Sequence, residues 1–383
     1  MRAAWRVAGV LAALVVVSGM MALGCAPVSG GRPSVAVAAE ETATPGIDTA
    51  TSTVDATPAV PPSSTVVPNI TVAAVGDLLF DSAPKRLIRA EGGTAPFTKV
   101  ASRLKAADVT VGNLECPLSR RGSPVPNKTF TFQGDPRAVK GLTYAGFDFL
   151  SLANNHARDY GATALADTFT NLRAAGLRWA GAGRNRTEAW KPAFIERGGA
   201  RIAYLAFSEI TPANFAATSS RSGTAYSYDT DKVMSAIKAA KKQADYVIVS
   251  FHWGIERNYS PTARQVGEGR RAIRAGADMV LAQHPHVIQG VEFYRDGLIA
   301  YSLGNFVFSP GNVGGRDTMI LHATMTPSGI TSVTAEPCWI GYNGRPVPQT
   351  GSVAKRILGV IKKTSTSRGT TVRISGSIAR LRP

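Results

Sequence analysis

The sequence predicts an α/β protein with a largely parallel sheet covered by helices on both faces. Two observations predict it: short apolar, β-branched runs recur along the chain, and amphipathic, Ala-rich stretches lie between them. Most of these runs are followed by a loop rich in glycine or polar residues, as expected where a buried strand ends. The 383 residues are 44% hydrophobic, enough for a packed core in one large domain or two ordinary ones.

The predicted strands share the pattern of an apolar run followed by a loop. They are residues 70–75, 108–111, 147–152, 244–250, 277–282 and 298–302. Helical spacing predicts helices at 162–175, 231–243 and 262–275, and Asp229 offers a cap for the second of them. Residues 319–340 alternate like strands without helices between them, which predicts an antiparallel edge or a second sheet.

The start of the chain predicts export. Arg2 and Arg6 precede an apolar run, so we interpret residues 1–28 as a signal peptide or lipoprotein signal. The segment ending in Cys25 resembles a lipoprotein box, which makes Cys25 the candidate lipidation site. Cleavage near residues 36–39 or an uncleaved anchor are the alternatives. The expected location is extracytoplasmic and associated with the cell envelope, as a membrane-anchored lipoprotein or a secreted protein.

Two further segments flank the predicted domain, which covers residues 69–344. Residues 29–68 are Ala, Thr, Ser, Val and Pro without a period, which predicts a disordered linker. Residues 345–383 contain basic residues and no acid, which predicts a basic C-terminal tail. Together with the net charge of +17, this tail would attract a polyanion or simply aid solubility. No nucleic-acid recognition module is evident, so a polymer of the cell surface is the better candidate partner.

Four of the five histidines directly follow predicted strands: His156, His252, His284 and His286. The carboxyl ends of parallel strands meet at one rim of a sheet, where ligands bind. Asp77, Glu115 and Asn155 occupy similar positions. A single histidine of this kind would be interpreted as structural, as we interpret His322 inside a predicted strand. Four at equivalent places, beside two carboxylates and an amide, predict a metal site.

The His284-Pro285-His286 segment is the sharpest local signal. In an extended segment, residues i and i+2 point the same way, so both imidazoles could meet one ion or two adjacent ions. Carboxylate, imidazole and amide ligands without thiolate favour a divalent transition metal, Mn, Fe, Zn or Co, and suffice for two ions. Cys116 and Cys338 could form a disulfide or remain buried thiols.

The motifs, taken in order, resemble a known family. They are Gly76-Asp77, Gly112-Asn113-Leu114-Glu115, Asn154-Asn155-His156, His252-Trp253-Gly254, His284-Pro285-His286-Val287 and Ser302-Leu303-Gly304-Asn305-Phe306. This order and spacing, over residues 70–344, resembles the CapA family of poly-γ-glutamate capsule proteins. That family is similar in turn to the calcineurin-like metallophosphoesterases. The resemblance implies a four-layer α/β/β/α sandwich of the metallophosphoesterase type.

The resemblance also implies roles for the site residues. Asp77 corresponds to the first metal-binding aspartate, Asn155 to the amide ligand, and His156 to the catalytic histidine that protonates the leaving group. The remaining metal ligands correspond to His252, His284 and His286. Two departures stand out. The motif Asp-x-His becomes Asp77-Leu78-Leu79, which removes one imidazole ligand. The bridging aspartate is replaced by Asn113 and Glu115, of which the Glu115 carboxylate is the better bridge.

The function implied is an exported, metal-dependent hydrolase-like protein of capsule or poly-γ-glutamate synthesis, export or wall attachment, acting on a phosphoester or an anionic polymer. Its partners would be that polymer, the capsule synthesis machinery and, through the N-terminal anchor, the membrane. The alternative is a non-catalytic tethered module that binds a polyanion with a structural metal. Supporting or substrate roles are assigned to Asn113, Trp253, Ser302 and Asn305, although Trp253 could simply pack in the core. Anion binding or plain solvation is expected for Arg120, Arg121 and Lys128.

Overall fold

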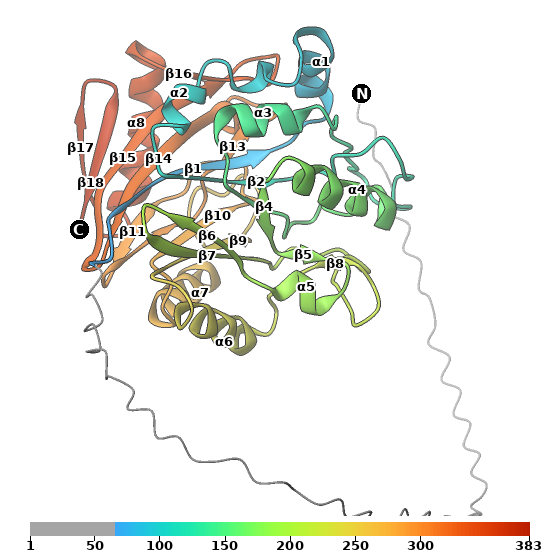
Figure 1. Cartoon of the computed structure of the whole chain (residues 1–383). Coiled ribbons are helices and arrows are strands. Elements are labelled where there is room, and N and C mark those ends of the chain that lie inside the picture. The colour runs from blue at the N-terminus through green and yellow to red at the C-terminus, as the bar shows by residue number, and fades with distance from the viewer. Residues whose placement is uncertain (1–65) are drawn as a thin grey trace, which may run out of the picture. The chain divides into compact units, whose positions relative to one another are not determined.

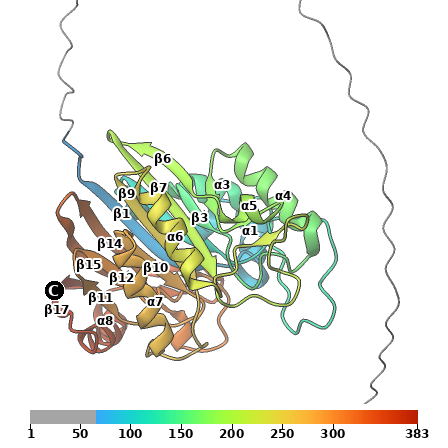
Figure 2. The same cartoon turned by 90° about the horizontal axis from the view of Figure 1, so that it is seen from below.

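The computed structural model describes residues 66–383. The predicted signal, the linker up to residue 65 and the candidate lipidation site Cys25 lie outside the described residues. Within the described part, two sheets pack face to face, and helices cover both outer faces (Figures 1 and 2). The same part contains no helix long and apolar enough to span a membrane.

The first sheet has ten strands within the described residues. Their order is β17-β18-β15-β14-β1-β2-β3-β4, with β13 beside β1 and β16 beside β15. The bounds are β1 (Ile70–Leu78), β2 (Val109–Leu114), β3 (Phe149–Ser151), β4 (Arg178–Ala180), β13 (Asn305–Val307), β14 (Asp317–Thr326), β15 (Gly329–Ile340), β16 (Pro346–Pro348), β17 (Thr371–Ser375) and β18 (Ile378–Arg382).

The second sheet has six strands in the same part of the chain, in the order β11-β12-β10-β9-β7-β6. These are β6 (Ala193–Arg197), β7 (Ala200–Ser208), β9 (Tyr246–His252), β10 (Met279–Gln283), β11 (Val291–Tyr294) and β12 (Gly297–Ala300). A separate two-stranded ladder pairs β5 (Ala182–Gly183) with β8 (Gly223–Thr224).

The helices are short and alternate with the strands along the chain. They are α1 (Ser82–Glu91), η1 (Ala95–Phe97), α2 (Ala101–Leu104), α3 (Ala138–Ala145), α4 (Gly161–Ala174), α5 (Arg186–Trp190), α6 (Thr230–Lys241), α7 (Ala263–Arg274), η2 (Gly314–Arg316) and α8 (Gly351–Thr366). Three of them, α4, α6 and α7, confirm the helices predicted from apolar spacing. Asp229 caps α6 by accepting a hydrogen bond from the Lys232 amide, as expected.

Alternating residues of β1 belong to two different cores. Val72 and Ala74 pack between the sheets, in a cluster that includes Tyr204 of β7. Ala73 and Val75 face the other way, into the cluster formed with the helices on the outer face of the first sheet. A third cluster packs α6 and α7 against the outer face of the second sheet. The four-layer α/β/β/α arrangement is therefore confirmed.

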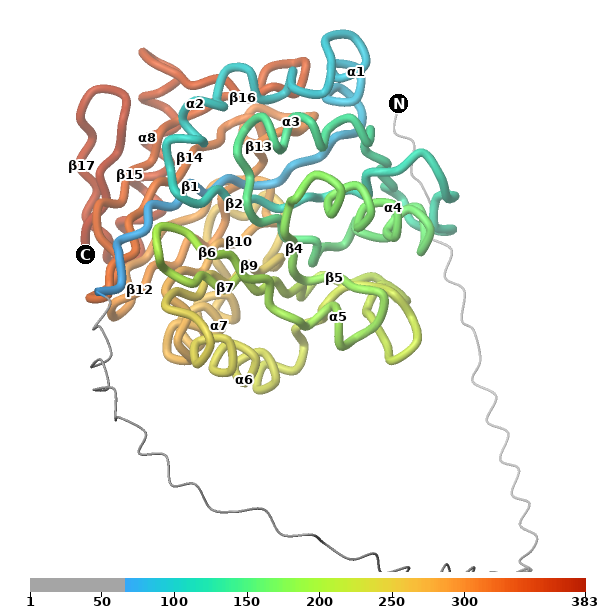
Figure 3. Tube along the Cα trace, in the orientation of Figure 1, coloured from blue at the N-terminus to red at the C-terminus, as the bar shows by residue number. Residues whose placement is uncertain are grey.

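The strands that carry the predicted site run parallel in each sheet, as expected: β1, β2 and β3 in the first, β7, β9 and β10 in the second. Residues 319–340 form neither an edge nor a separate sheet. They lie in β14 and β15, an antiparallel extension of the first sheet in which β14 pairs with β1. The Cα trace shows this pairing of the first strand with a late one (Figure 3).

The basic segment 345–383 is folded into the domain and is not a projecting tail. Helix α8 buries Ile357, Leu358 and Ile361 in the core between the sheets, and β18 pairs with β15. Within the described residues the compact unit accordingly extends to Pro383, so the boundary expected at residue 344 is wrong. The boundary is wrong because these elements carry their apolar residues on one face only, and the many basic residues on the other face hide this pattern in the composition.

Cys116 and Cys338 are both free and buried, so of the two alternatives the structure has the buried thiols. The Phe80 amide donates a hydrogen bond to the Cys116 sulfur at 3.3 Å. Burial raises the pKa of both thiols, which keeps them protonated and unreactive at neutral pH.

Candidate metal centre

The two sheets bring their carboxyl-end loops together at one place. Asp77 lies near the end of β1, and the next strand, β2, ends just before Glu115. His252 is the last residue of β9, and the loop after β10 carries His284 and His286. Segments more than 200 residues apart in sequence thus share one site, since His286 Nδ1 lies 3.2 Å from Asp77 Oδ2.

Gly76 allows β1 to approach the loop at Gly304. A Cβ atom on Gly76 would lie 1.8 Å from the Gly304 carbonyl oxygen, so a larger residue would push the two segments apart. That carbonyl instead accepts a hydrogen bond from the Asp77 amide at 2.9 Å. The register of β1 against β2 also shifts just before Asp77, and such irregularities re-aim side chains near functional sites.

Two asparagines orient the buried carboxylates. Asn113 Nδ2 donates to Asp77 Oδ1 at 2.8 Å and to Glu115 Oε2 at 3.3 Å. Asn154 Nδ2 donates to Asn113 Oδ1 at 3.1 Å, and Asn154 Oδ1 accepts from the His156 amide at 3.0 Å. Each carboxylate therefore uses one oxygen to hold its position and keeps the other free.

The centre contains polar atoms that are buried without a hydrogen-bond partner in the described structure. They are Asp77 Oδ2, Glu115 Oε1, His252 Nδ1 and His284 Nδ1. Each such atom costs roughly 1–3 kcal/mol unless something satisfies it. Ligand atoms of Asp77, Glu115 and His252 lie within 4.8 Å of one another. Oxygen and imidazole ligands without thiolate fit a divalent transition metal, so these residues could hold the predicted ion.

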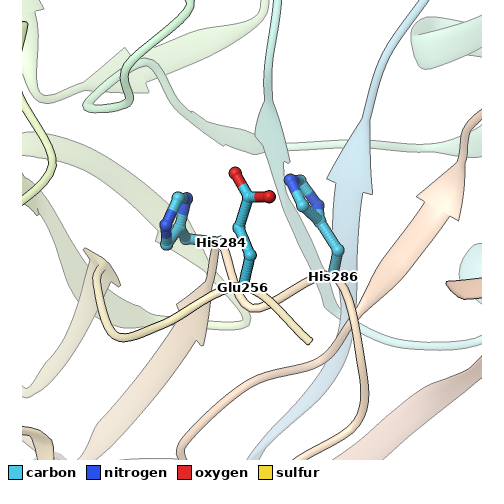
Figure 4. A group of neighbouring side chains, drawn as sticks. All are labelled: Glu256, His284 and His286. Atoms are coloured by element: carbon cyan, nitrogen blue, oxygen red, sulfur yellow. The ribbon is translucent and has the colours of Figure 1, made fainter. Parts of the chain in front are cut away.

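A second group of possible ligands adjoins the first. It consists of Glu256, His284 and His286, whose ligand atoms also lie within 4.8 Å of one another. In Figure 4 the Glu256 carboxylate stands between the two imidazoles. His286 connects the groups, because its Nε2 lies 3.9 Å from Glu115 Oε1. Two adjacent groups of three ligands offer room for two ions.

The backbone of the His284-Pro285-His286 segment differs from the expected one. His284 and His286 have φ angles of +98° and +57°, so the segment is a tight loop and the extended geometry predicted for it is wrong. The two rings nevertheless lie 5.8 Å apart between centroids. Positive φ in residues other than glycine is costly and concentrates at functional sites.

The remaining predicted ligand, Asn155, also reaches the centre. Its Oδ1 lies 2.8 Å from His252 Nε2. That nitrogen lies 3.7 Å from Glu115 Oε1. All six residues proposed as metal ligands from the sequence are thus linked through short contacts, from Asn155 through His252 and Glu115 to His286 and Asp77, with the His284 ring 4.8 Å from that of His252.

The two carboxyl groups have pKa values shifted in opposite directions. Burial tends to raise the pKa of Asp77, but the neighbouring His286 outweighs it and the pKa lies below its ordinary value. The pKa of Glu115 is raised well above its ordinary value by burial and by the charge of Asp77. A bound cation would reverse the shift at Glu115, so metal binding is expected to release a proton there.

The histidines are held mostly in the neutral form that metal ligands require. Burial, with the charge of His284, lowers the pKa of His252 well below its ordinary value, and burial lowers that of His284 to about 3. For His286 burial acts in the same direction, but contact with Asp77 outweighs it and raises the pKa. His252 and His284 therefore present lone pairs at neutral pH.

The low pKa of His284 predicts how the metal-free chain responds to acid. In the folded state the pKa is about 3, against an ordinary value of 6.5, so on acidification the unfolded chain takes up the proton first. The stability that neutral His284 contributes is complete above about pH 6.5 and is lost toward pH 3, at up to about 1.4 kcal/mol per pH unit. Denaturant unfolding of the EDTA-treated chain is expected to show this loss from about pH 7 to about pH 5.

The variant His284→Asn isolates this contribution. It removes the titrating group, so its free energy of unfolding should depend less steeply on pH than that of the wild type. The raised pKa of Glu115 acts oppositely, since its contribution is lost as pH rises, but it is common to both proteins. Parallel pH curves for the two proteins would contradict the assignment.

His156 adjoins the centre with a different set of contacts. Its Nδ1 lies 2.6 Å from Asp159 Oδ2 and 2.9 Å from Lys128 Nζ. Lys128 also donates to Asp159 Oδ1 at 2.5 Å. Burial lowers the pKa of His156, and the Asp159 charge offsets only part of this effect. Because Nδ1 is occupied, Nε2 is the nitrogen left for chemistry.

A cleft opens over the centre, and His156, His286 and Glu256 all contribute to its wall. The other side chains in contact with it include the aromatic residues Phe130, Phe132 and Phe308 and the basic residue Arg257. Apolar walls with a few converging polar groups are typical of ligand sites. The cleft therefore offers both apolar contacts and charged groups to a ligand beside the centre.

The other residues singled out from the sequence fall into two groups. Asn305 Oδ1 contacts His286 Nδ1 at 2.9 Å, and Ser302 Oγ donates to the Val287 carbonyl at 2.8 Å, so both support the histidine loop. Trp253 is fully buried, stacks on Phe251 with ring centroids 4.5 Å apart, and belongs to the core.

The basic residues of the predicted rim do not act together. Arg121 pairs with Asp167, and Arg120 is exposed beside a separate hollow lined by Arg137 and Lys85. Lys128 is different, because it lies behind His156 and is paired with the buried Asp159. The structure thus brings one of the three to the centre.

Sequence reasoning missed Glu256, Asp159 and the linking role of Asn154. Glu256 lies two residues after Gly254 in the loop that follows His252, and Asp159 lies three residues after His156. Both are acidic residues close to a predicted strand end, which is the signal that could have found them. The positions of their side chains depend on loop geometry, which spacing in the sequence does not determine.

The fold and these side chains together define a four-layer α/β protein with a candidate divalent-metal centre. Residues 71–310 match the family described as "Bacterial capsule synthesis protein PGA_cap", and the chain belongs to this family, as its motifs predict. It is 32% identical over 293 residues to "Capsule biosynthesis protein CapA" of Bacillus anthracis, covering 75% of this chain and 71% of that protein. It is 31% identical over 281 residues to "PGA biosynthesis protein CapA" of Bacillus subtilis (strain 168), covering 73% of each.

The solved structures that match are more distant. One is the NAD nucleotidase of Haemophilus influenzae, at 13% identity and a TM-score of 0.44, covering 77% of this chain and 63% of that chain. Another is a putative 5'-nucleotidase of Staphylococcus aureus, at 15% identity and a TM-score of 0.41, covering 76% and 57%.

Proposed function

We propose that this chain is a metal-dependent hydrolase of the cell envelope that acts in capsule or poly-γ-glutamate synthesis, export or wall attachment. Its substrate would be a phosphoester or an anionic polymer. The observation that carries the proposal is the position of His156. It lines the same cleft as the candidate ligand His286, while its own Nδ1 is held by Asp159 and Lys128.

This arrangement supports general acid catalysis by His156. Its Nε2 would give a proton to the leaving atom, the oxygen of a phosphoester or the nitrogen of an amide, and the Asp159 carboxylate would stabilise the positively charged ring through Nδ1. Burial lowers the pKa of His156 in the free protein. An anionic substrate in the cleft would raise it, so binding and protonation would favour each other.

The ligand groups supply the rest of the site. Divalent ions held by Asp77, Glu115, Asn155 and the three histidines would activate water and neutralise charge on the substrate. Arg257, at the wall of the cleft, would attract the anionic group and orient it. The aromatic walls would exclude water around the reacting bond.

A substrate panel tests the proposal. We expect the purified chain with Mn²⁺ to hydrolyse at least one of p-nitrophenyl phosphate, bis-p-nitrophenyl phosphate and poly-γ-glutamate. EDTA should abolish this turnover and added Mn²⁺ should restore it, because the reaction needs a charged ion to activate water. Absence of turnover on every substrate, combined with tight binding of poly-γ-glutamate, would reject the hydrolase.

Polymer binding without turnover would support the alternative, a non-catalytic binding module. One feature of the fold favours that alternative. In the β17–β18 hairpin Arg373 lies directly opposite Arg380, and both are exposed. Like charges facing each other across a ladder are destabilising unless an anion lies between them. Replacing both arginines with serine would lower polymer affinity under this alternative and leave metal content unchanged.

A further inference from the structure

The candidate centre lacks one imidazole that its metallophosphoesterase-like motif would supply. The residue at that position is Leu79, two residues after Asp77. Leu79 is 2% exposed and packs in the apolar cluster under the helices of the first sheet. Its side chain has no ligand atom, so it cannot bind an ion.

Glu256 offers a ligand from the opposite side of the centre. Its carboxylate is within 4.8 Å of ligand atoms of both His284 and His286, and Figure 4 shows it between the two rings. His284 is 5% exposed, and its Nδ1 has no hydrogen-bond partner in the described structure. His284 therefore has a buried nitrogen without a partner and belongs to a group with a carboxylate and a second imidazole, which are the ligand types of a transition metal site.

The fold holds Glu256 in this place. The loop that carries it begins at Trp253, which is anchored in the core and whose amide donates to the Gln283 carbonyl at 3.2 Å. Just after Glu256, the Arg257 amide donates to the Pro285 carbonyl at 2.8 Å. These two bonds tie the loop, before and after Glu256, to Gln283 and Pro285, the residues on either side of His284. Arg257 also adopts a φ of +60°, a further costly backbone conformation beside the centre.

The balance of charge points the same way. Asp77, Glu115 and Glu256 place three carboxyl groups around one cluster of imidazoles, so the two ligand groups are rich in negative charge. Glu256 also lines the cleft, where a bare carboxylate would repel an anionic substrate. A cation bound between Glu256 and the histidines would remove both disadvantages.

We propose that Glu256, together with His284 and His286, binds a second divalent cation beside the one held by Asp77, Glu115 and His252. The inference rests on the metal centre of the proposed function, but it concerns ion number and does not require turnover. Glu256 can act as this ligand because its loop is hydrogen-bonded to the loop that carries the two histidines.

Metal stoichiometry tests the inference. We expect the wild-type chain to bind two Mn²⁺ ions by calorimetry and to contain two after loading, measured by elemental analysis. Glu256→Gln should retain one ion and weaken the second by about 100-fold or more, since the loss of a supporting residue alone costs about 10–100-fold. Glu256→Asp, which keeps the charge, should recover part of the affinity.

The matched control is Glu196→Gln, an exposed glutamate on β6 that contacts Arg201 at 3.8 Å. It should leave both ions bound. Thermal unfolding of each metal-free variant confirms that the fold is intact. A wild-type chain that binds a single ion, or a Glu256→Gln chain that binds two with unchanged affinity, would overturn the inference. Two ions without hydrolysis of any substrate would instead reject the proposed function and leave this inference standing.

Discussion

Replacing His156 with alanine is expected to reduce turnover by about 10²–10⁴-fold and to leave the metal content unchanged. His156 contacts Asp159 and Lys128 through Nδ1, and in the described structure it forms no ion pair with Asp77 or Glu115. The loss should therefore fall on kcat for substrates with a poor leaving group. Substrates with a good leaving group, such as p-nitrophenyl esters, should be affected less, because they need no proton.

His322 provides the control for this prediction. It is half-buried in β14, paired in register with Ala73, and is the one described histidine that belongs to neither ligand group nor the cleft. His322→Gln should change turnover less than about twofold. Equal loss in both variants would indicate damage to the fold. Normal turnover in His156→Ala would remove this residue from the mechanism.

The variant Glu115→Gln is expected to have the second large effect, on metal binding. Glu115 Oε1 lies 3.7 Å from His252 Nε2 and 3.9 Å from His286 Nε2, so one oxygen faces both ligand groups. An amide has nearly the same shape but no charge to neutralise two cations. We expect the affinity for both ions to fall by about 100-fold or more. At a metal concentration of 100 times the wild-type Kd, a 100-fold loss removes about 2.3 kcal/mol of stabilisation per ion.

The same substitution should have the opposite effect on the metal-free chain. The Glu115 carboxyl is 1% exposed and one of its oxygens has no partner, so its burial is costly. Glutamine keeps a polar head of the same shape but removes the charge that burial beside Asp77 disfavours. We therefore expect the free energy of unfolding of the metal-free chain to rise by roughly 1–3 kcal/mol. Chemical denaturation with and without Mn²⁺ measures both effects.

Glu292 is the matched control for Glu115. It is also buried, but its carboxylate pairs with Arg270 at 2.7 Å and accepts from the Tyr301 hydroxyl at 2.6 Å. Glu292→Gln should therefore destabilise the chain and leave metal affinity unchanged. If Glu115→Gln destabilised the metal-free chain as Glu292→Gln does, Glu115 would be a satisfied structural residue and the bridging role would be wrong.

Much of this arrangement could be predicted from the sequence, because strand ends are easy to recognise. Each apolar run that ends beside Asp77, Glu115 or His252 is a buried strand, and parallel strands place their ends on one rim. The helices could be predicted equally well. Thr262 and Gln265, for example, form a capping box at the start of α7, one of the predicted helices.

Other features required the fold. The division of the strands into two sheets, and the extension of the first sheet by β14 and β15, depend on long-range pairing that no local pattern specifies. The hairpin of β17 and β18 buries Val372, Ala379 and Leu381. Its three arginines, in a segment without acidic residues, led to the prediction of a basic tail. The alternation of His284 and His286 predicts an extended segment, but both residues adopt positive φ angles, which spacing in the sequence does not reveal.

The most direct test of the account is a crystal structure of the Mn²⁺-loaded chain with anomalous diffraction measured at the manganese edge. We expect two anomalous peaks, one among Asp77, Glu115 and His252 and one among Glu256, His284 and His286. A loaded crystal with no peak at these residues, or with its manganese bound elsewhere, would contradict the claim that the ends of the two sheets form a metal centre.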